Sequence, residues 1–96
     1  MRVLLVEDDP TTQQSVTMML ESAGMVVDAT DLGEDGLEIG KLYDYDIIVL
    51  DLMLPDMDGF NVCNEIRKVN LELPVIILTA KTSEADIIEG LSLGAD

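Results

Sequence analysis

The chain has 96 residues, the length of one small domain. Its formal net charge is -15, from 20 acidic residues against 5 basic ones. This balance argues against direct contact with nucleic acid, whose binding depends on basic side chains, and against binding to an anionic membrane surface. It is compatible with a multivalent cation, or with a partner that carries basic groups.

The residue types that are missing narrow the chemistry further. Cys63 is the only cysteine, so neither an intrachain disulfide nor a thiolate metal cage can form. The absence of histidine excludes catalytic triads built on imidazole and metal sites with imidazole ligands. We find no signal peptide and no apolar run of membrane-spanning length, and we therefore expect a cytoplasmic domain.

Apolar runs and helical periodicity alternate along the chain. Short apolar runs predict four strands, at Arg2–Val6, Met25–Ala29, Asp46–Leu50 and Val75–Leu78. Four helices are predicted: one from Pro10 to about Gly24 with Asp9 as N-cap, then Glu34–Tyr43, Phe60–Val69, and one after Ser83.

These elements predict an α/β fold of the flavodoxin-like type. Strands that are apolar throughout are buried on both faces, which is typical of a parallel sheet. Right-handed crossover connections then place helices on both faces of that sheet. The strand order 2-1-3-4 would make the first, third and fourth strands neighbours, so that their carboxyl ends meet.

Two of the predicted helices have features that the structure can test. Gly36 and Gly40 weaken the second helix by about 1 kcal/mol each relative to alanine. In the third helix the apolar residues recur in steps of three, which is the pattern that predicts this helix; they are Phe60, Cys63, Ile66 and Val69.

Polar side chains gather at the predicted carboxyl ends of three strands. Glu7 and Asp8 follow the first strand, Asp51 ends the third, and Thr79 follows the fourth. Clustered carboxylates repel one another and need a cation, and an all-oxygen ligand set favours a hard ion such as Mg2+. Asp51 could then act as the nucleophile that forms an aspartyl-phosphate, with Thr79 as a donor to a phosphoryl oxygen.

Simpler interpretations exist for the same acidic residues. The run Glu7-Asp8-Asp9 could serve only as favourable charge at a helix N-terminus. The later residues Asp56, Asp58, Gly59 and Glu65 match four positions of an EF-hand calcium loop. That match fails because the first ligand position is Leu54 and a strand precedes the loop, so we expect the two aspartates to face solvent.

The motifs LLVEDD, LDLMLPDMDG, LTA and LGAD, at residues 4–9, 50–59, 78–80 and 93–96, together resemble the receiver domain of two-component response regulators. The resemblance runs along the whole chain and its motif set is specific. Within this family the chain is most similar to the winged-helix transcription factors of the OmpR/PhoB class. The segment Ala29–Asp46 resembles the cell-cycle regulators of alphaproteobacteria.

This resemblance implies a role for the carboxylates and for one backbone carbonyl. Asp51 would be the phosphoacceptor, which takes its phosphate from a sensor histidine kinase or a histidine phosphotransfer protein. Mg2+ would be bound by Asp8, Asp51 and the backbone carbonyl of Met53, and by Glu7 through a water molecule. The domain would not be an enzyme, although it would assist its own phosphorylation and dephosphorylation.

The resemblance also implies how the phosphoryl group is sensed and lost. Thr79 would be the switch hydroxyl, and the small Ala80 would leave access to the phosphate. Met53 and Lys81 would flank the path of the attacking water and tune the phosphate lifetime. The output would be transcription regulation through a DNA-binding domain, whereas this domain itself would contact neither nucleic acid nor membrane.

The chain departs from the family pattern at its end. Receivers continue into a fifth strand and a fifth helix, and the lysine that contacts the phosphoryl group would lie beyond Asp96. Residues 1–96 are therefore interpreted as an incomplete receiver domain. Without the fifth strand, Val75–Leu78 would be a sheet edge, which favours self-association through that strand or through the fourth helix.

Two rival functions remain open from the sequence. The first is a phosphorylation-incompetent receiver that acts as an interaction module. The second is a phosphohydrolase with an aspartate nucleophile, an enzyme class that usually has a second aspartate where this chain has Met53.

Overall fold

The computed structural model describes residues 1–51, 54–56, 58–69 and 73–78. Its elements are β1 (Arg2–Val6), α1 (Pro10–Ser22), β2 (Val26–Thr30), α2 (Gly33–Leu42), β3 (Ile47–Asp51), α3 (Gly59–Val69) and β4 (Val75–Leu78). Each matches its predicted counterpart to within two residues at either end. The helix predicted after Ser83 lies outside the described residues.

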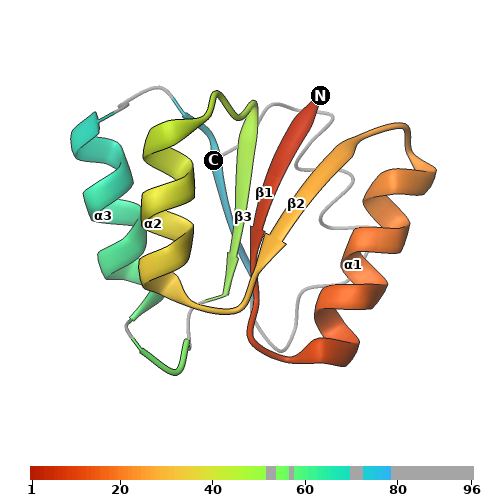
Figure 1. Cartoon of the computed structure of the whole chain (residues 1–96), viewed down its shortest axis with the longest axis horizontal. Coiled ribbons are helices and arrows are strands. Elements are labelled where there is room, and N and C mark those ends of the chain that lie inside the picture. Colours follow the sequence, from red (N-terminus) through yellow and green to blue (C-terminus); the bar gives the residue numbers. More distant parts are fainter. Residues whose placement is uncertain (52–53, 57, 70–72, 79–96) are drawn as a thin grey trace.

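The four strands form one parallel sheet in the order β2-β1-β3-β4, which confirms the predicted flavodoxin-like order (Figure 1). The register pairs Val6 with both Thr30 and Leu50, and Asp51 with Leu78. The strands therefore end side by side, and the residues that follow them share one edge of the sheet.

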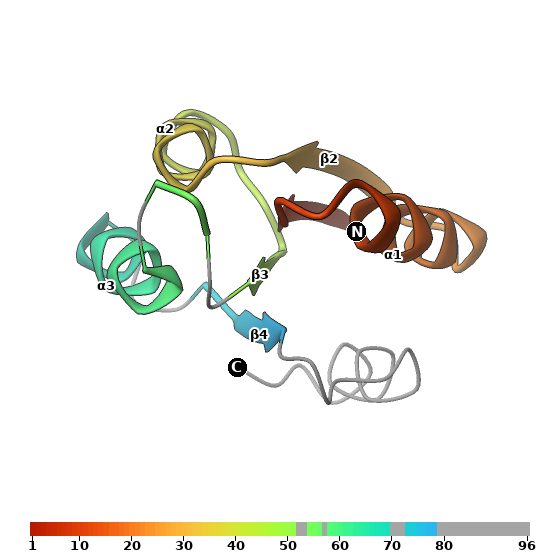
Figure 2. The same cartoon turned by 90° about the horizontal axis from the view of Figure 1, so that it is seen from below.

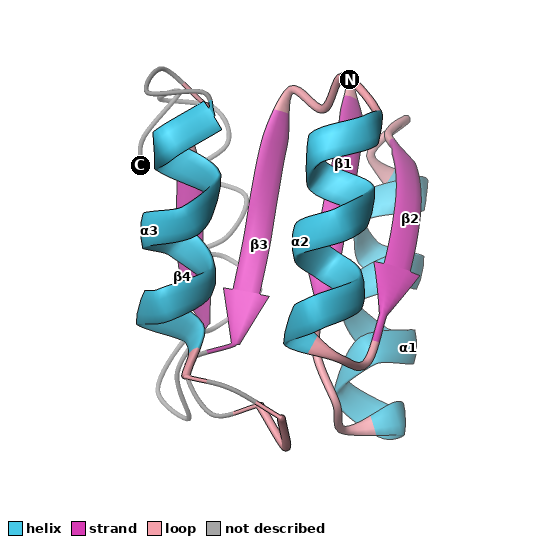
Figure 3. Ribbon diagram, turned by 60° about the vertical axis from the view of Figure 1, so that its left-hand side comes forward, coloured by secondary structure: helices cyan, strands magenta, loops and turns pink. Residues whose placement is uncertain are grey.

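Helices cover both faces of the sheet, as the apolar strands predicted. Helix α1 lies on one face, and α2 and α3 lie side by side on the other (Figures 2 and 3). The alternating side chains of β1 and β3 separate into two cores. One core packs Val3, Leu5, Ile47 and Val49 against α1, and the other packs Leu4, Val6, Ile48 and Leu50 against α3.

Helix α1 begins and ends where the sequence predicted. The Asp9 carboxylate accepts a hydrogen bond from the backbone N–H of Thr12 at 2.9 Å, which makes it the N-cap, and Pro10 is the first helical residue. Gly24 follows the helix with a φ of 85°, a backbone conformation that glycine adopts without strain. None of the helices in the described part of the chain has the length and apolar character needed to cross a membrane.

The predicted third helix is confirmed as α3, but only some of its apolar residues are buried. Val62 and Ile66 are buried and Cys63 packs against the same core, but Phe60 and Val69 are 59% and 62% exposed. A helical turn takes 3.6 residues, so side chains at steps of three drift around the axis. Over nine residues this drift carries Phe60 and Val69 to opposite sides of the helix.

A polar cluster at the amino-terminal edge of the sheet joins β1, β2 and the start of β3. The Arg2 guanidinium lies 2.8 Å from the Asp28 carboxylate, which also accepts a hydrogen bond from the Tyr45 hydroxyl at 2.8 Å. The same guanidinium lies 5.2 Å from the ring centroids of Tyr43 and Tyr45. Burial, together with Asp28, raises the pKa of Tyr45 to about 12. This cluster ties the strands together at the end away from the acidic residues.

The two glycines of α2 have different packing environments. A Cβ on Gly36 would lie 2.7 Å from a methyl carbon of Val6, which is fully buried and branched at its own Cβ. A Cβ on Gly40 would lie 3.5 Å from the nearest atom, a normal contact distance. Glycine at position 36 therefore allows α2 to approach the end of β1, whereas at position 40 the packing leaves room for a side chain.

The two glycine-to-alanine substitutions should change stability in opposite directions. Gly36→Ala gains helix propensity but forces Val6 or α2 to move, and overpacking costs about 1–3 kcal/mol. Gly40→Ala meets no such barrier and should stabilise the fold by up to about 1 kcal/mol. Urea denaturation of the two variants and the wild type measures both effects. A Gly36→Ala chain that is as stable as Gly40→Ala would contradict the close packing of α2 on β1.

Candidate functional site

Three carboxylates meet at the carboxyl edge of the sheet. Glu7, Asp8 and Asp51 each offer an oxygen atom, and these atoms all lie within 4.8 Å of one another. Two features of the backbone bring them together: the parallel pairing of β1 with β3, and the register that places Val6 beside Leu50. Glu7 and Asp51 are the next residues of the two strands, so they leave the sheet side by side.

Glu7 is fixed by hydrogen bonds from two directions. Its backbone N–H donates to the carbonyl of Thr30 at 3.0 Å, which continues the pairing of β1 with β2 by one residue. Its carbonyl accepts a hydrogen bond from the Gln13 side-chain amide at 2.9 Å, and its Oε1 accepts one from the backbone N–H of Asp9 at 3.1 Å. The residue is 5% exposed, and among the described residues it is the only buried one that is charged or polar.

This environment holds the carboxyl group of Glu7 in a neutral state at mildly acidic pH. Burial is the largest cause, because it disfavours the charged form, and the nearby carboxylates of Asp51 and Asp8 act in the same direction. The hydrogen bond from Asp9 opposes them. Together these effects raise the pKa of Glu7 to about 7.

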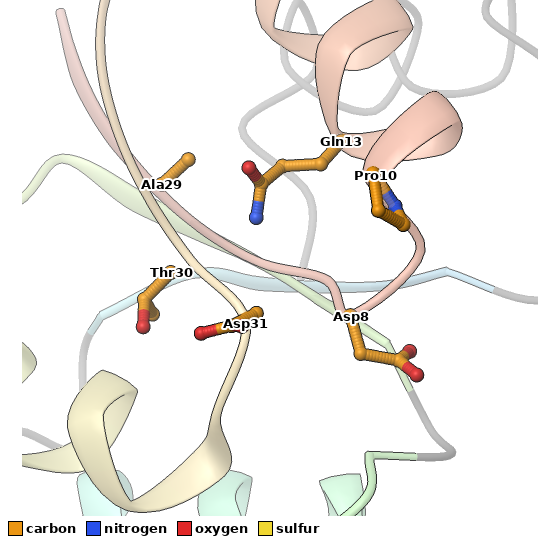
Figure 4. Close-up of a pocket in the computed structure, with 6 residues that line it drawn as sticks. All are labelled: Asp8, Pro10, Gln13, Ala29, Thr30 and Asp31. Carbon is orange, nitrogen blue, oxygen red and sulfur yellow. The ribbon is translucent and has the colours of Figure 1, made fainter.

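Asp8 is exposed and belongs both to the carboxylate cluster and to the lining of a surface hollow. The hollow has a volume of about 240 Å³ and is lined by Asp8, Pro10, Gln13, Ala29, Thr30 and Asp31. Figure 4 shows the Gln13 side chain extending from α1 toward the end of β2, while the Asp8 carboxylate points away from Thr30 and Asp31. Asp8 is thus accessible from solvent, whereas Glu7 is buried.

The loop that follows Asp51 is attached to the rest of the fold at several points. Leu54 packs against the core on the α2 and α3 face of the sheet. The Asp58 carboxylate accepts a hydrogen bond from the backbone N–H of Phe60 at 2.8 Å, and its carbonyl accepts one from Asn61 at 3.0 Å, at the start of α3. Asp56 accepts hydrogen bonds from the N-terminus of α2, through the backbone N–H groups of Gly33 and Glu34.

Asp56 and Asp58 are exposed, as predicted, but the expectation that they merely face solvent was incomplete. Each carboxylate is an acceptor for the backbone at the start of a helix. The segment also follows strand β3, so it lacks the leading helix of an EF-hand, which supports the rejection of that interpretation. The contact of Asp56 with α2 could not be read from sequence spacing, because Gly33 and Glu34 precede Asp56 by 23 and 22 residues.

Four of the predicted site residues cannot be placed. Met53, Thr79, Ala80 and Lys81 lie outside the described residues, so their roles stay predictions. The described part of the site consists of Glu7, Asp8 and Asp51.

The donor set fits a small, hard divalent cation. All three side chains provide oxygen, which Mg2+ prefers. Each carboxylate offers an oxygen within 4.8 Å of the other two, which is near enough for one cation to lie among them. A buried carboxyl with a raised pKa also indicates that the cluster would gain from a positive charge.

Comparison with known proteins agrees with this geometry. The family model described as the response regulator receiver domain matches residues 3–96. The cell cycle response regulator CtrA of Brucella ovis is 50% identical over all 96 residues of the chain, which spans 41% of that relative's length. The chain therefore covers less than half of that relative, and the match concerns this part of it alone.

Two solved structures share the fold. A CheY-like response regulator receiver domain from Methanospirillum hungatei superposes with a TM-score of 0.81 at 27% identity, and the match covers 99% of this chain and 76% of that one. The receiver domain of a sensor histidine kinase from Pseudomonas aeruginosa has a TM-score of 0.81 at 33% identity, with coverage of 99% and 80%. That structure has a magnesium ion coordinated in its active site cleft.

The motifs, the 2-1-3-4 sheet and the family match all agree, and the predicted resemblance is confirmed. This chain belongs to the response regulator receiver domain family.

Proposed function

We propose that Asp51 accepts a phosphoryl group from a phosphohistidine, and that Mg2+ is required for the transfer. The observation that carries this proposal is the convergence of Glu7, Asp8 and Asp51 within 4.8 Å, in a chain that belongs to the receiver family. Asp51 suits the role of acceptor because it is half-buried at the end of a central strand. The donor would be a sensor histidine kinase or a histidine phosphotransfer protein.

The transfer needs a nucleophile, and it needs the negative charges around the phosphoryl group to be neutralised. A carboxylate oxygen of Asp51 forms a bond to phosphorus while the bond between phosphorus and the donor's imidazole nitrogen breaks. The electron pair of that bond stays on the departing imidazole, and the product is an aspartyl-phosphate. No proton has to leave the acceptor, since a carboxylate is already a nucleophile at neutral pH. This accounts for a site that contains no histidine of its own.

The cation would be held mainly by Asp8 and Asp51, with Glu7 acting through a water molecule and the carbonyl of Met53 as a further ligand. A bound Mg2+ neutralises the carboxylates and stabilises the charge on the transferred phosphoryl oxygens. The raised pKa of Glu7 and the exposure of Asp8 are both consistent with this division of roles. The magnesium ion in the Pseudomonas aeruginosa receiver gives the proposal further support.

The remaining roles follow from the resemblance and are part of the same proposal. Thr79 would donate to the phosphoryl group, Ala80 would leave room for it, and Met53 and Lys81 would tune its lifetime. The domain would act as a signalling acceptor, with no separate substrate to turn over. In the whole protein the phosphorylated domain would control a DNA-binding output, as expected of a relative of a cell cycle response regulator.

Acetyl phosphate with Mg2+ should phosphorylate the wild-type chain but not Asp51→Asn. The amide cannot attack phosphorus, so the acid-labile mass gain of one phosphoryl group should disappear. Asp44→Asn is a matched control, because Asp44 is an exposed aspartate before β3 and away from the carboxyl edge. Intact mass spectrometry, repeated with EDTA, measures the yield for each chain.

Equal phosphorylation of Asp51→Asn and the wild type would rule out Asp51 as the acceptor. A wild type that binds Mg2+ but never takes phosphate would instead favour the receiver as an interaction module. Steady turnover of a phosphate monoester would favour the phosphohydrolase.

The metal-free chain should lose stability as the pH rises from about 5 to about 7. The folded-state pKa of Glu7 is raised from 4.5 to about 7, so in this window the folded state holds a proton that the unfolded state has released. Glu7→Gln should abolish this loss and exceed the wild type in stability at pH 7.5. Urea denaturation at pH 5.5 and 7.5, with and without Mg2+, provides the comparison.

Mg2+ should stabilise the wild type at pH 7.5 more than at pH 5.5, since proton and cation compete for the same cluster. If wild type and Glu7→Gln show the same dependence on pH, Glu7 is not the titrating group.

A further inference from the structure

The carboxylate of Asp56 joins the loop that leaves Asp51 to the N-terminus of α2. Its Oδ1 accepts a hydrogen bond from the backbone N–H of Gly33 at 2.8 Å, and its Oδ2 accepts one from that of Glu34 at 2.9 Å. Both oxygens of one carboxylate thus bind consecutive amides. Two parallel bonds to a charged acceptor restrict orientation as well as distance, so this contact is more rigid than a single hydrogen bond.

Helix α2 needs an acceptor from outside its own sequence. The first N–H groups of a helix have no partner within it, and they are usually capped by the side chain of the residue just before. Here that residue is Leu32, which makes no side-chain cap hydrogen bond. Asp56, which follows β3 in the sequence, provides the missing acceptor. Its negative charge also lies at the positive end of the helix dipole.

Helix α2 also packs against the end of β1, next to Glu7. A Cβ on Gly36 would lie 2.7 Å from a methyl carbon of Val6, the residue before Glu7. Thr30 is the last residue of β2, just before the connection to α2. Its carbonyl accepts a hydrogen bond from the backbone N–H of Glu7. Helix α2 is therefore in close contact with the strand end that bears Glu7. Through Asp56 it also binds the loop that follows Asp51.

We propose that Asp56 is a positioning residue for the acidic site, which acts by fastening the loop after Asp51 to α2. Loss of this contact would free the loop and loosen the spacing between Asp51 and the pair Glu7 and Asp8. The affinity for Mg2+ should then fall, because ligands that must be ordered on binding hold a cation less tightly. The inference rests on the proposed function, since it concerns the same metal and the same acceptor.

Asp56→Ala should weaken Mg2+ binding by about tenfold, the effect typical of removing a group that orients metal ligands. Asp56→Asn keeps one carbonyl acceptor and should fall between Asp56→Ala and the wild type. Asp35→Ala is the matched control, because Asp35 is an exposed aspartate in the first turn of the same helix. It removes the same charge from the same helix end. Each chain is titrated with Mg2+ and followed by NMR, at a temperature at which circular dichroism shows it to be folded.

The phosphorylation rate with acetyl phosphate should follow the same order at Mg2+ concentrations below saturation, and added Mg2+ should recover part of the loss in Asp56→Ala. In that variant the amide protons of Gly33 and Glu34 should also shift upfield, as the hydrogen bonds to Asp56 are lost.

Three results would overturn the inference. In the first, folded Asp56→Ala binds Mg2+ as tightly as the wild type, so Asp56 contributes stability alone. In the second, Asp35→Ala loses as much affinity as Asp56→Ala, so the effect is one of distant charge. In the third, the wild type itself neither binds Mg2+ nor takes phosphate, a result that contradicts the proposed function as well. The first two leave the proposed function intact.

Discussion

The parallel register between β1 and β3 is the constraint on which the site depends. Because Val6 lies opposite Leu50, the next residue of each strand is a carboxylate, and the two emerge side by side from the most buried part of the sheet. A slip of one residue would turn every side chain of a strand to the other face and separate the apolar clusters from their helices. The two cores that flank β1 and β3 therefore hold the acidic residues together against their mutual repulsion.

That repulsion explains several features of the carboxyl edge. Glu7 is buried and its pKa is raised to about 7, so the protein relieves part of the charge by keeping a proton near neutral pH. Asp8 remains exposed, where water screens it, and Asp51 is only half-buried. A divalent cation would replace the proton and draw the three oxygens together. Helix α2 contacts both the end of β1 and the loop that follows β3. It packs against Val6 through Gly36, and the backbone N–H groups at its N-terminus donate hydrogen bonds to Asp56.

Local sequence patterns predicted the order and limits of the elements, the parallel sheet and the three converging carboxylates. They succeeded because buried parallel strands are continuously apolar and because Asp9-Pro10 is a strong local signal for a helix start. They failed where distant residues decide the outcome. The exposure of Phe60 depends on how α3 is rotated on the sheet. The cluster of Arg2, Asp28 and Tyr45 assembles from β1, β2 and the segment before β3, and Asp56 caps a helix far away in sequence. By helix propensity alone Gly36 weakens α2, but in the structure the missing side chain leaves room for Val6.

The central claim is that one cation and one phosphoryl group share the carboxyl edge at Asp51. Crystals of the chain grown with Mn2+ and beryllofluoride, a stable mimic of the phosphoryl group, would test it most directly through the anomalous signal of the metal. We expect a single metal peak within direct bonding distance of the Asp8 and Asp51 carboxylates, about 2.1–2.2 Å away, with beryllium bonded to an oxygen of Asp51. A metal bound elsewhere, or beryllofluoride attached to a different carboxylate, would contradict the account.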